Sequence, residues 1–301
     1  MVDFMVNESF RDDIVFVILN YNVYDETLDC VNSIKANING NRYHILIIDN
    51  CSPNNSGKRL QEFYNNDFFV KVLITEENLG FAKGNNVGIK YAREKWFPKY
   101  ICCLNNDTIF LQKDFLTKLE KSYIESNAAV IGPKIILKND SVQPLMGNLK
   151  DVGAYKRDLE INTYGTIPYR IARFKEYVYG YASVHYLKDF IKSHIRDIKS
   201  PSSRAENIVL HGCCLIFTPL FFKKLEGFDP RTFLFREEEL LLIMLNKNQL
   251  TSLYEPELCI KHLEDVSTNK TYSDNNEKNK FLIENQAKSL KILISELSSK
   301  L

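Results

Sequence analysis

The first half of the chain alternates short apolar runs with segments of helical periodicity, and this alternation constrains the fold most. Short apolar runs predict strands at residues 14–19, 44–48, 70–74 and 100–104. A helical pattern follows the first run, and we expect Asp25 to cap that helix. Strands that alternate with helices are joined by right-handed crossovers. The sequence therefore predicts an α/β fold with a mostly parallel sheet.

The later part of the chain has a less regular pattern. A loop rich in glycine and asparagine, Asn78–Asn86, is expected to lead into a helix that ends near Trp96. Residues 138–206 suggest long loops with short elements, and Pro219 suits the first turn of a helix. Further strands are predicted at 128–137, 208–217 and up to 263, and further helices at 111–126, 237–245 and 283–301.

Composition excludes several classes of protein. The 39 basic and 38 acidic residues leave a net charge of +1, so we expect no nucleic-acid partner. The amino terminus has no basic and apolar leader, and we expect no signal peptide. No apolar run approaches the roughly 18–20 residues of a membrane span. The seven cysteines are scattered, and the pairs Cys102–Cys103 and Cys213–Cys214, which lie in apolar runs, suggest small buried side chains in a reducing cytoplasm.

Polar side chains end the fourth predicted strand. Asn105, Asn106 and Asp107 follow the apolar run directly. Open α/β sheets bind ligands beyond the carboxyl ends of their strands. A carboxylate there suits Mg²⁺ or Mn²⁺, which also accept phosphate oxygens and water. The structural alternative is a turn in which the aspartate caps the next helix.

The second strand ends in a similar way. Asp49 follows it, with Asn50 and Ser52 beside it. A carboxylate at this position can accept hydrogen bonds from a nucleotide base or ribose, or can instead form an Asx turn. Gly80 and Gly84 would let the backbone approach a ligand at the start of the following helix.

Acidic residues and one histidine supply the remaining candidates. Glu237, Glu238 and Glu239 open a predicted helix, where they could act as a general base or only complement the helix dipole. His262 ends an apolar run and is either structural or a ligand of a divalent cation.

Together these segments resemble the family 2 glycosyltransferases, and in particular the rhamnosyltransferase-like branch that builds bacterial surface polysaccharides. The resemblance runs in order from about residue 14 to 268. It rests on these segments: Val17–Asn22, Ile47–Ser52, Asn78–Gly88, Leu104–Thr108, Gly227–Pro230, Phe233–Glu238, and His262 near Ser267.

The resemblance implies a GT-A fold in residues 1–270, with a nucleotide-sugar half at about 12–137 and an acceptor half at 138–270, followed by an amphipathic helical extension at 271–301. It implies a catalytic base at Glu238 or Glu237, and a Mg²⁺ or Mn²⁺ site at Asp107 and His262. Asn105 replaces the first acidic residue of the family's Asp-x-Asp motif. The residues expected to contact the nucleotide sugar are Asn20, Asn22, Asp49, Asn50, Ser52, Asn78, Gly80, Phe81, Gly84, Asn85, Asn105 and Asn106.

The expected activity is inverting transfer of a hexosyl or rhamnosyl group from a dTDP- or UDP-sugar. The expected acceptor is a saccharide on a polyprenyl diphosphate, and the expected location is the cytoplasm, with peripheral contact at the inner face of the plasma membrane. The terminal helix could pack on the catalytic body, form a homodimer or lie on the membrane. A silent nucleotide-sugar-binding or assembly subunit is the main alternative function, and a nucleotidyltransferase is a further one.

Overall fold

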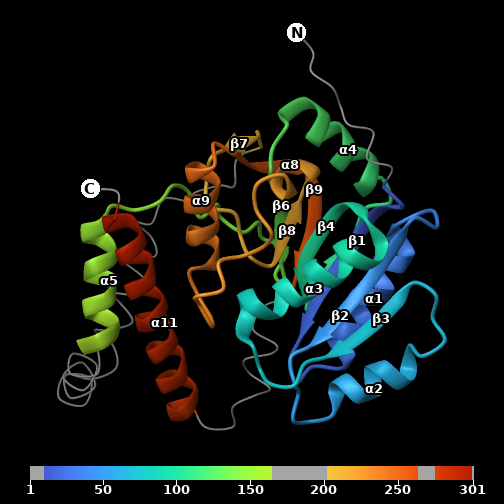
Figure 1. The fold of residues 1–301 in the computed structure, drawn as a ribbon, viewed down its shortest axis with the longest axis horizontal. Helices are drawn as coiled ribbons and strands as arrows, with labels where there is room; N and C mark the ends of the chain where they lie inside the picture. The colour runs from blue at the N-terminus through green and yellow to red at the C-terminus, as the bar shows by residue number, and fades with distance from the viewer. Residues whose placement is uncertain (1–9, 165–201, 264–274, 300–301) are drawn as a thin grey trace.

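The computed structural model of the chain describes residues 10–164, 202–263 and 275–299. A central sheet runs through these residues in the order β3-β2-β1-β4-β8-β6-β9-β5, and β7 pairs with β9 beside this path. Figure 1 shows helices packed around the sheet, with α9, α11 and α5 gathered at one side. This arrangement is the α/β fold with a central sheet and flanking helices that the sequence predicts.

The amino-terminal part forms the regular half of the sheet. β1 pairs in parallel with β2 and β4, and β2 pairs in parallel with β3. The three segments between these strands are helices, as the apolar periodicity predicts. The elements are β1 (Asp12–Asn20), α1 (Asp25–Asn37), β2 (Tyr43–Asp49), α2 (Ser56–Phe63), β3 (Val70–Ile74), α3 (Gly80–Trp96) and β4 (Pro98–Asn105).

The second half of the sheet is mixed. β8 runs antiparallel to β4 and β6, and β9 runs parallel to β6 but antiparallel to β5. The parallel expectation therefore holds for the first half and for one later pair. The elements are β5 (Thr108–Phe110), α4 (Phe115–Ser126), β6 (Val130–Leu137), α5 (Val152–Tyr164), β7 (Ala205–Glu206), β8 (Cys214–Phe217), α8 (Pro219–Phe222), α9 (Glu237–Lys247), β9 (Ser252–His262) and α11 (Asn275–Ser298).

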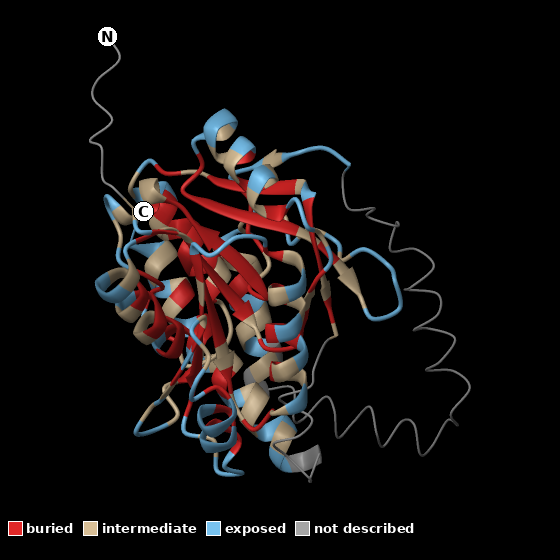
Figure 2. Ribbon diagram, turned by 90° about the vertical axis from the view of Figure 1, so that its right-hand side faces the viewer, coloured by how far each residue is buried: buried red, intermediate tan, exposed pale blue. Residues whose placement is uncertain are grey.

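The sheet is buried on both faces, which explains why its central strands are continuously apolar rather than alternating. One core cluster joins the sheet to α1, α2 and α4, and the other joins it to α3, α8 and α9. Figure 2 shows the buried residues concentrated in the strands, with the exposed ones on the outer sides of the helices. The polar ends of these strands are therefore held on a rigid base.

Two local predictions in the first half are wrong. Asp25 is the first residue of α1, whereas Tyr24 occupies the cap position and makes no capping hydrogen bond through its side chain. The segment expected as a loop at 78–86 is already helical from Gly80 onward. Glycine suggested a loop here, but Gly84 and, just beyond the segment, Gly88 lie within α3. There they let the helix pack closely on Leu19 and Val17 of β1.

Three further predictions fail in the second half. A short strand, β5, follows Asp107 where only a turn and a helix were expected. In the segment predicted as a strand at 208–217, only Cys214–Phe217 is a strand. The helix α5 lies within the region expected to be mostly loops, and α11 stabilises it from the side. Pro219 does lie in the first turn of α8, as predicted.

The terminal helix α11 packs on the body of the protein. Its Leu290 and Leu293 are buried against Tyr155 of α5 and against Leu240 and Ile243 of α9. Of the three roles considered for this helix, the structure shows intramolecular packing. The first residues of the extension expected at 271–301, and Ser267 near His262, lie outside the described residues.

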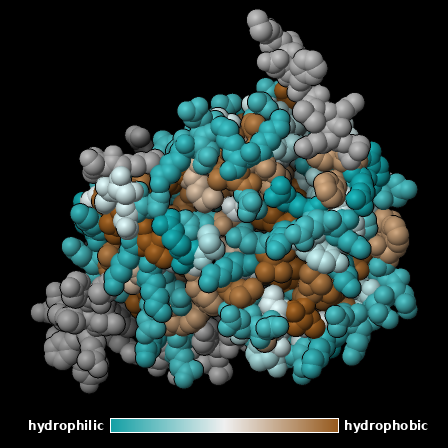
Figure 3. Space-filling view, in the orientation of Figure 1, coloured by the Kyte–Doolittle hydropathy of each residue, from teal (hydrophilic) through white to brown (hydrophobic). Residues whose placement is uncertain are grey.

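Apolar residues reach the surface in separate patches among hydrophilic ones on the face shown in Figure 3. Within the described residues, no helix combines the length and the apolar character needed to cross a membrane.

Candidate functional site

The pairing of β5 with β9 brings together two residues that are far apart in the sequence. Thr108 lies opposite His262 in this antiparallel ladder. As a result Asp107 Oδ1 lies 3.2 Å from His262 Nε2, and both residues are buried. A turn closed by the hydrogen bond from Thr108 Oγ1 to the carbonyl of Asn105 holds the aspartate in this place. The predicted metal ligands therefore do meet.

The environment of this pair fits a divalent cation. His262 Nε2 is buried and makes no hydrogen bond to any described residue, although the carboxylate lies close by. A buried nitrogen that lacks a hydrogen bond costs about 1–3 kcal/mol, and a shared cation would satisfy the nitrogen and the carboxylate together. The described residues contain no cluster of three or more metal-ligating side chains. The remaining coordination positions would thus fall to water or phosphate oxygens, as is usual for Mg²⁺ and Mn²⁺.

A second histidine, His211, lies beside the pair and was missed in the sequence. Its ring centroid is 5.8 Å from that of His262. Burial, reinforced by His262, lowers the pKa of His211 to about 4, so this imidazole is neutral at physiological pH. Its Nδ1 accepts the backbone N–H of Cys213 at 3.2 Å, which leaves the proton on Nε2. The available signal was a single polar residue within an apolar run.

The three glutamates occupy different environments at the start of α9. Glu239 forms an ion pair with Arg236 at 2.7 Å. Glu238 Oε1 accepts the backbone N–H of Gly212 at 3.2 Å. Glu237 is only 5% exposed, so its carboxyl is largely shielded from water. All three glutamates line the cavity described below, and the backbone N–H of Gly212 holds Glu238 there.

Electrostatics separates the two candidate bases further. Burial and the neighbouring Glu238 raise the pKa of Glu237 to about 8. Burial and the neighbouring Glu239 raise the pKa of Glu238 to about 7. A general base works best when its pKa lies near the working pH. At neutral pH Glu237 is mostly protonated, whereas about half of Glu238 is ionised, which favours Glu238 as the base.

The backbone before these glutamates is strained. Phe235 and Arg236 have φ values of 72° and 70°, so two consecutive non-glycine residues are left-handed. Such conformations cost about 1–3 kcal/mol each and are maintained only by surrounding contacts. One contact is the hydrogen bond from the N–H of Phe81 to the carbonyl of Phe233, at 2.8 Å. The start of α3 thus supports the loop that presents the glutamates.

A cavity of about 310 Å³ is lined by the three glutamates and by His211, whereas Asp107 and His262 are not among the residues that line it. Its volume is within the usual range for a small-molecule site. Predicted site residues on its wall are Phe81, Asn105, Glu237 and Glu238. His211 also lines it and connects it to the Asp107–His262 pair. The other predicted contacts, Asn20, Asn22, Asp49, Asn50, Ser52, Asn78, Gly80, Gly84, Asn85 and Asn106, are not among the residues that line this cavity.

Most of those other residues form a hydrogen-bonded network at the ends of β1 and β2. Asp49 is 1% exposed, and its carboxylate accepts hydrogen bonds from Asn20 Nδ2 at 2.6 Å and from Ser52 Oγ at 2.6 Å. Asn106 Nδ2 donates to Asn20 Oδ1 at 3.0 Å. The backbone N–H of Asn22 donates to Ser52 Oγ at 2.9 Å. Direct contact of Asp49 with a base or ribose remains a prediction, because its carboxylate faces protein groups here.

Asn50 connects this network to the start of α3. Its Nδ2 donates to Asn78 Oδ1 at 2.9 Å and to the carbonyl of Gly80 at 3.0 Å. Within α3, Asn85 Nδ2 donates to the carbonyl of Phe81 at 3.0 Å. These amides hold the backbone that carries Phe81 to the cavity.

We expect Gly80→Ala to destabilise the protein by about 2–4 kcal/mol, because it combines backbone strain with a steric clash. Gly80 has φ +75°, and an added Cβ would lie 2.2 Å from the carbonyl oxygen of Phe233. Gly40→Ala is the matched control, since Gly40 has φ +98° but no atom within 4 Å of an added Cβ. That change should cost about 1 kcal/mol in urea unfolding. Equal losses for both variants would show that the contact with Phe233 contributes nothing.

Comparisons with known proteins show which family and which fold the chain is similar to. The family model described as Glycosyl transferase family 2 matches residues 15–197. A curated relative is the low-salt glycan biosynthesis hexosyltransferase Agl10 of Haloferax volcanii, which is 22% identical over 131 residues, or 44% of this chain and 39% of the relative. The chain thus matches less than half of that relative's length.

Among solved structures, the chain is similar to residues 1–349 of S. aureus TarS, with a TM-score of 0.51 and 13% identity over 95% of this chain and 70% of that one. A longer TarS structure has a TM-score of 0.51 and 15% identity over 90% of this chain and 39% of that one. At these identities the likeness shows a common fold.

Proposed function

The chain belongs to glycosyl transferase family 2, and we propose that it is a glycosyltransferase that moves a sugar from a UDP- or dTDP-sugar to a saccharide hydroxyl with inversion. One observation carries this proposal. Asn105 and Glu238 line the same cavity, and His211 connects that cavity to the buried Asp107–His262 pair. A carboxylate in the cavity thus lies near, through His211, a buried pair suited to a cation that would bind a diphosphate.

The proposed reaction follows from this arrangement. Glu238 accepts the proton of the acceptor hydroxyl as its oxygen attacks the anomeric carbon of the donor. The bond from that carbon to the diphosphate oxygen breaks at the same time, and the electron pair leaves with the nucleoside diphosphate. Attack from the side opposite the leaving group inverts the anomeric configuration. A divalent cation held by Asp107 and His262 would stabilise the negative charge on the departing diphosphate.

The chain's own residues supply the remaining interactions in this proposal. His211, neutral and protonated on Nε2, can donate a hydrogen bond into the cavity without adding charge. The amide of Asn105 can donate to an oxygen of the donor. We assign binding of the nucleoside part of the donor to the network around Asp49. In this network the carboxylate of Asp49 holds Asn20 and Ser52 in position.

We propose a hexosyl donor, with rhamnosyl included, and a polyprenyl-diphosphate-linked saccharide acceptor. The similarity to a hexosyltransferase of glycan biosynthesis supports the sugar class. Transfer to a lipid-linked acceptor would place the enzyme at the inner face of the plasma membrane, where it would take part in the synthesis of a surface polysaccharide.

The decisive experiment is a thermal-shift screen of UDP- and dTDP-sugars with and without Mn²⁺, followed by measurement of nucleoside diphosphate release. A ligand that binds only the folded state raises the melting temperature by mass action. We expect one nucleotide sugar to stabilise the protein and to be turned over. Stabilisation without any turnover, with or without saccharides, would instead indicate a silent binding subunit. Absence of both effects for every sugar would refute the proposal.

The rate of transfer should depend on pH through Glu238. Burial and Glu239 raise the pKa of this carboxyl to about 7, and only its ionised form can accept a proton. We therefore expect kcat/KM to increase about tenfold per pH unit below 7 and to level off above it. A profile that stays flat between pH 5 and 8 would exclude Glu238 as the base. A parallel Glu237→Gln profile should retain the same ascending limb.

A further inference from the structure

The terminal helix α11 reaches the cavity as well as the outer surface of α9. Figure 1 shows α11 lying beside α5, and its leucines pack on α9. Gln286 of α11 lines the same cavity as Glu237 and Glu238. A helix that lies outside the nucleotide-binding half of the fold thus contributes a polar side chain to the wall of the site.

The position of Gln286 is set by hydrogen bonding nearby. Ser289, one turn further along α11, donates through Oγ to the carbonyl of Leu234 at 2.7 Å. Leu234 and Phe235 themselves line the cavity. The rings of Phe281 and Phe233 also contact each other, with centroids 6.2 Å apart. These contacts therefore fix α11 against the loop that leads to the glutamates.

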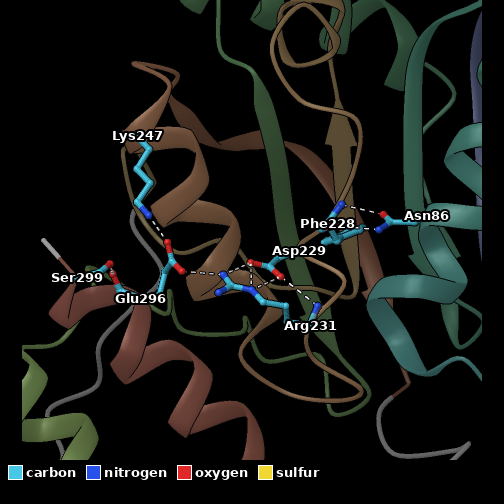
Figure 4. Close-up of polar contacts among 7 residues, drawn as sticks. All are labelled: Asn86, Phe228, Asp229, Arg231, Lys247, Glu296 and Ser299. Atoms are coloured by element: carbon cyan, nitrogen blue, oxygen red, sulfur yellow. Dashed lines mark hydrogen bonds and ion pairs between the residues drawn. The ribbon is translucent and has the colours of Figure 1, made fainter.

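Ion pairs hold the other end of α11 to the same loop. Glu296 accepts hydrogen bonds from Arg231 Nη2, at 2.8 Å, and from Lys247 of α9. Arg231 is also paired with Asp229, as Figure 4 shows. On the far side of the loop, Asn86 of α3 bonds both backbone groups of Phe228. The loop is thus held between α3 and α11, which limits movement of Gln286 relative to Glu238.

The chemistry of Gln286 matches a sugar hydroxyl. Its amide makes no hydrogen bond within the described part of the chain, so its donor and acceptor atoms are available to a ligand. A hydroxyl group also donates and accepts, and an amide can satisfy both of these functions. The neighbouring Phe235 and Leu234 offer apolar surface of the kind that surrounds a few orienting polar groups in ligand sites.

We propose that Gln286 binds a hydroxyl group of the acceptor saccharide and so helps to select the acceptor; this inference depends on the proposed glycosyl transfer. In the proposed function, the diphosphate of the donor lies near Asp107 and His262. Gln286 instead lines the cavity that Glu238 also lines, and the attacking hydroxyl must enter that cavity to reach its base. The terminal helix therefore forms part of the acceptor site.

The test compares Gln286→Met with Lys288→Met. Methionine has a length similar to that of glutamine and favours helices, but it lacks the amide. Lys288 is exposed on the same helix and serves as the matched control. Nucleoside diphosphate release from the donor found in the screen is measured with water alone and with a panel of octyl glycosides of common hexoses.

We expect Gln286→Met to raise the KM for the stimulating glycoside about 3- to 10-fold, the effect of losing one neutral hydrogen bond. Lys288→Met should match the wild type with water and with every glycoside, whereas the loss in Gln286→Met should be larger with glycoside than with water. An unchanged acceptor KM would overturn the inference, as would equal losses with water and with glycoside. Wild-type turnover in water that no glycoside stimulates would also overturn it. Absence of turnover in either condition would instead refute the proposed function.

Discussion

Glu238→Gln should abolish nearly all glycosyl transfer while the protein continues to bind its nucleotide-sugar donor. A general base typically contributes about 10²- to 10⁴-fold to the rate, and we expect a loss in that range. Glutamine retains an oxygen that can accept the hydrogen bond from Gly212, so the local structure should persist. Donor binding is measured by thermal shift, and transfer by release of the nucleoside diphosphate.

Glu237→Gln is the matched comparison for this variant. Its carboxyl lies in the same cavity, but its pKa is raised to about 8, so it is mainly protonated at neutral pH. A neutral amide resembles that protonated form, and the rate should fall by less than about tenfold. A severe loss in Glu237→Gln together with a mild one in Glu238→Gln would reverse the assignment of the base.

Asp107→Asn should remove the response to divalent cations. We expect Mn²⁺ no longer to raise the melting temperature in the presence of the nucleotide sugar. Transfer should decrease by about 10²-fold or more, because stabilisation of the leaving diphosphate by a cation contributes several kcal/mol. The substitution also removes the negative charge that lies 3.2 Å from His262 Nε2, and with it most of the electrostatic attraction for a cation at this position.

Asp140→Asn is the control for this variant. Asp140 is exposed on the surface and forms an ion pair with Lys261, the residue that precedes His262 in the sequence. Its removal should leave both the Mn²⁺ response and the rate unchanged. If Asp107→Asn retains the wild-type response to Mn²⁺, or if EDTA has no effect on the wild type, the metal assignment is incorrect.

Sequence patterns select candidate residues for a site but do not give the surroundings of their side chains. Asp107 and His262 were selected as ligands from strand ends and from the resemblance, and the structure places them side by side. Asp49 was selected on the same grounds, yet its carboxylate is enclosed by Asn20 and Ser52. A polar residue at a strand end can face a ligand or the protein, and local sequence does not distinguish the two.

Two residues of the cavity wall could not be assigned from local patterns. His211 lies in a run that resembles a buried strand, but the chain turns there and places the imidazole beside His262. Gln286 occupies an ordinary polar position on an amphipathic helix. Its role depends on where that helix packs, which is decided by contacts with α5 and α9.

The amino-acid sequence by itself determined the alternation of strands and helices in the first half, because apolar periodicity and turn residues act over a few neighbouring positions. Tertiary structure alone decided which polar residues meet. The pairing of β5 with β9 joins Asp107 to His262, and the packing of α11 brings Gln286 to the cavity beside Glu238. These contacts depend on sheet register and helix docking, which arise from burial of apolar surface between segments distant in the chain.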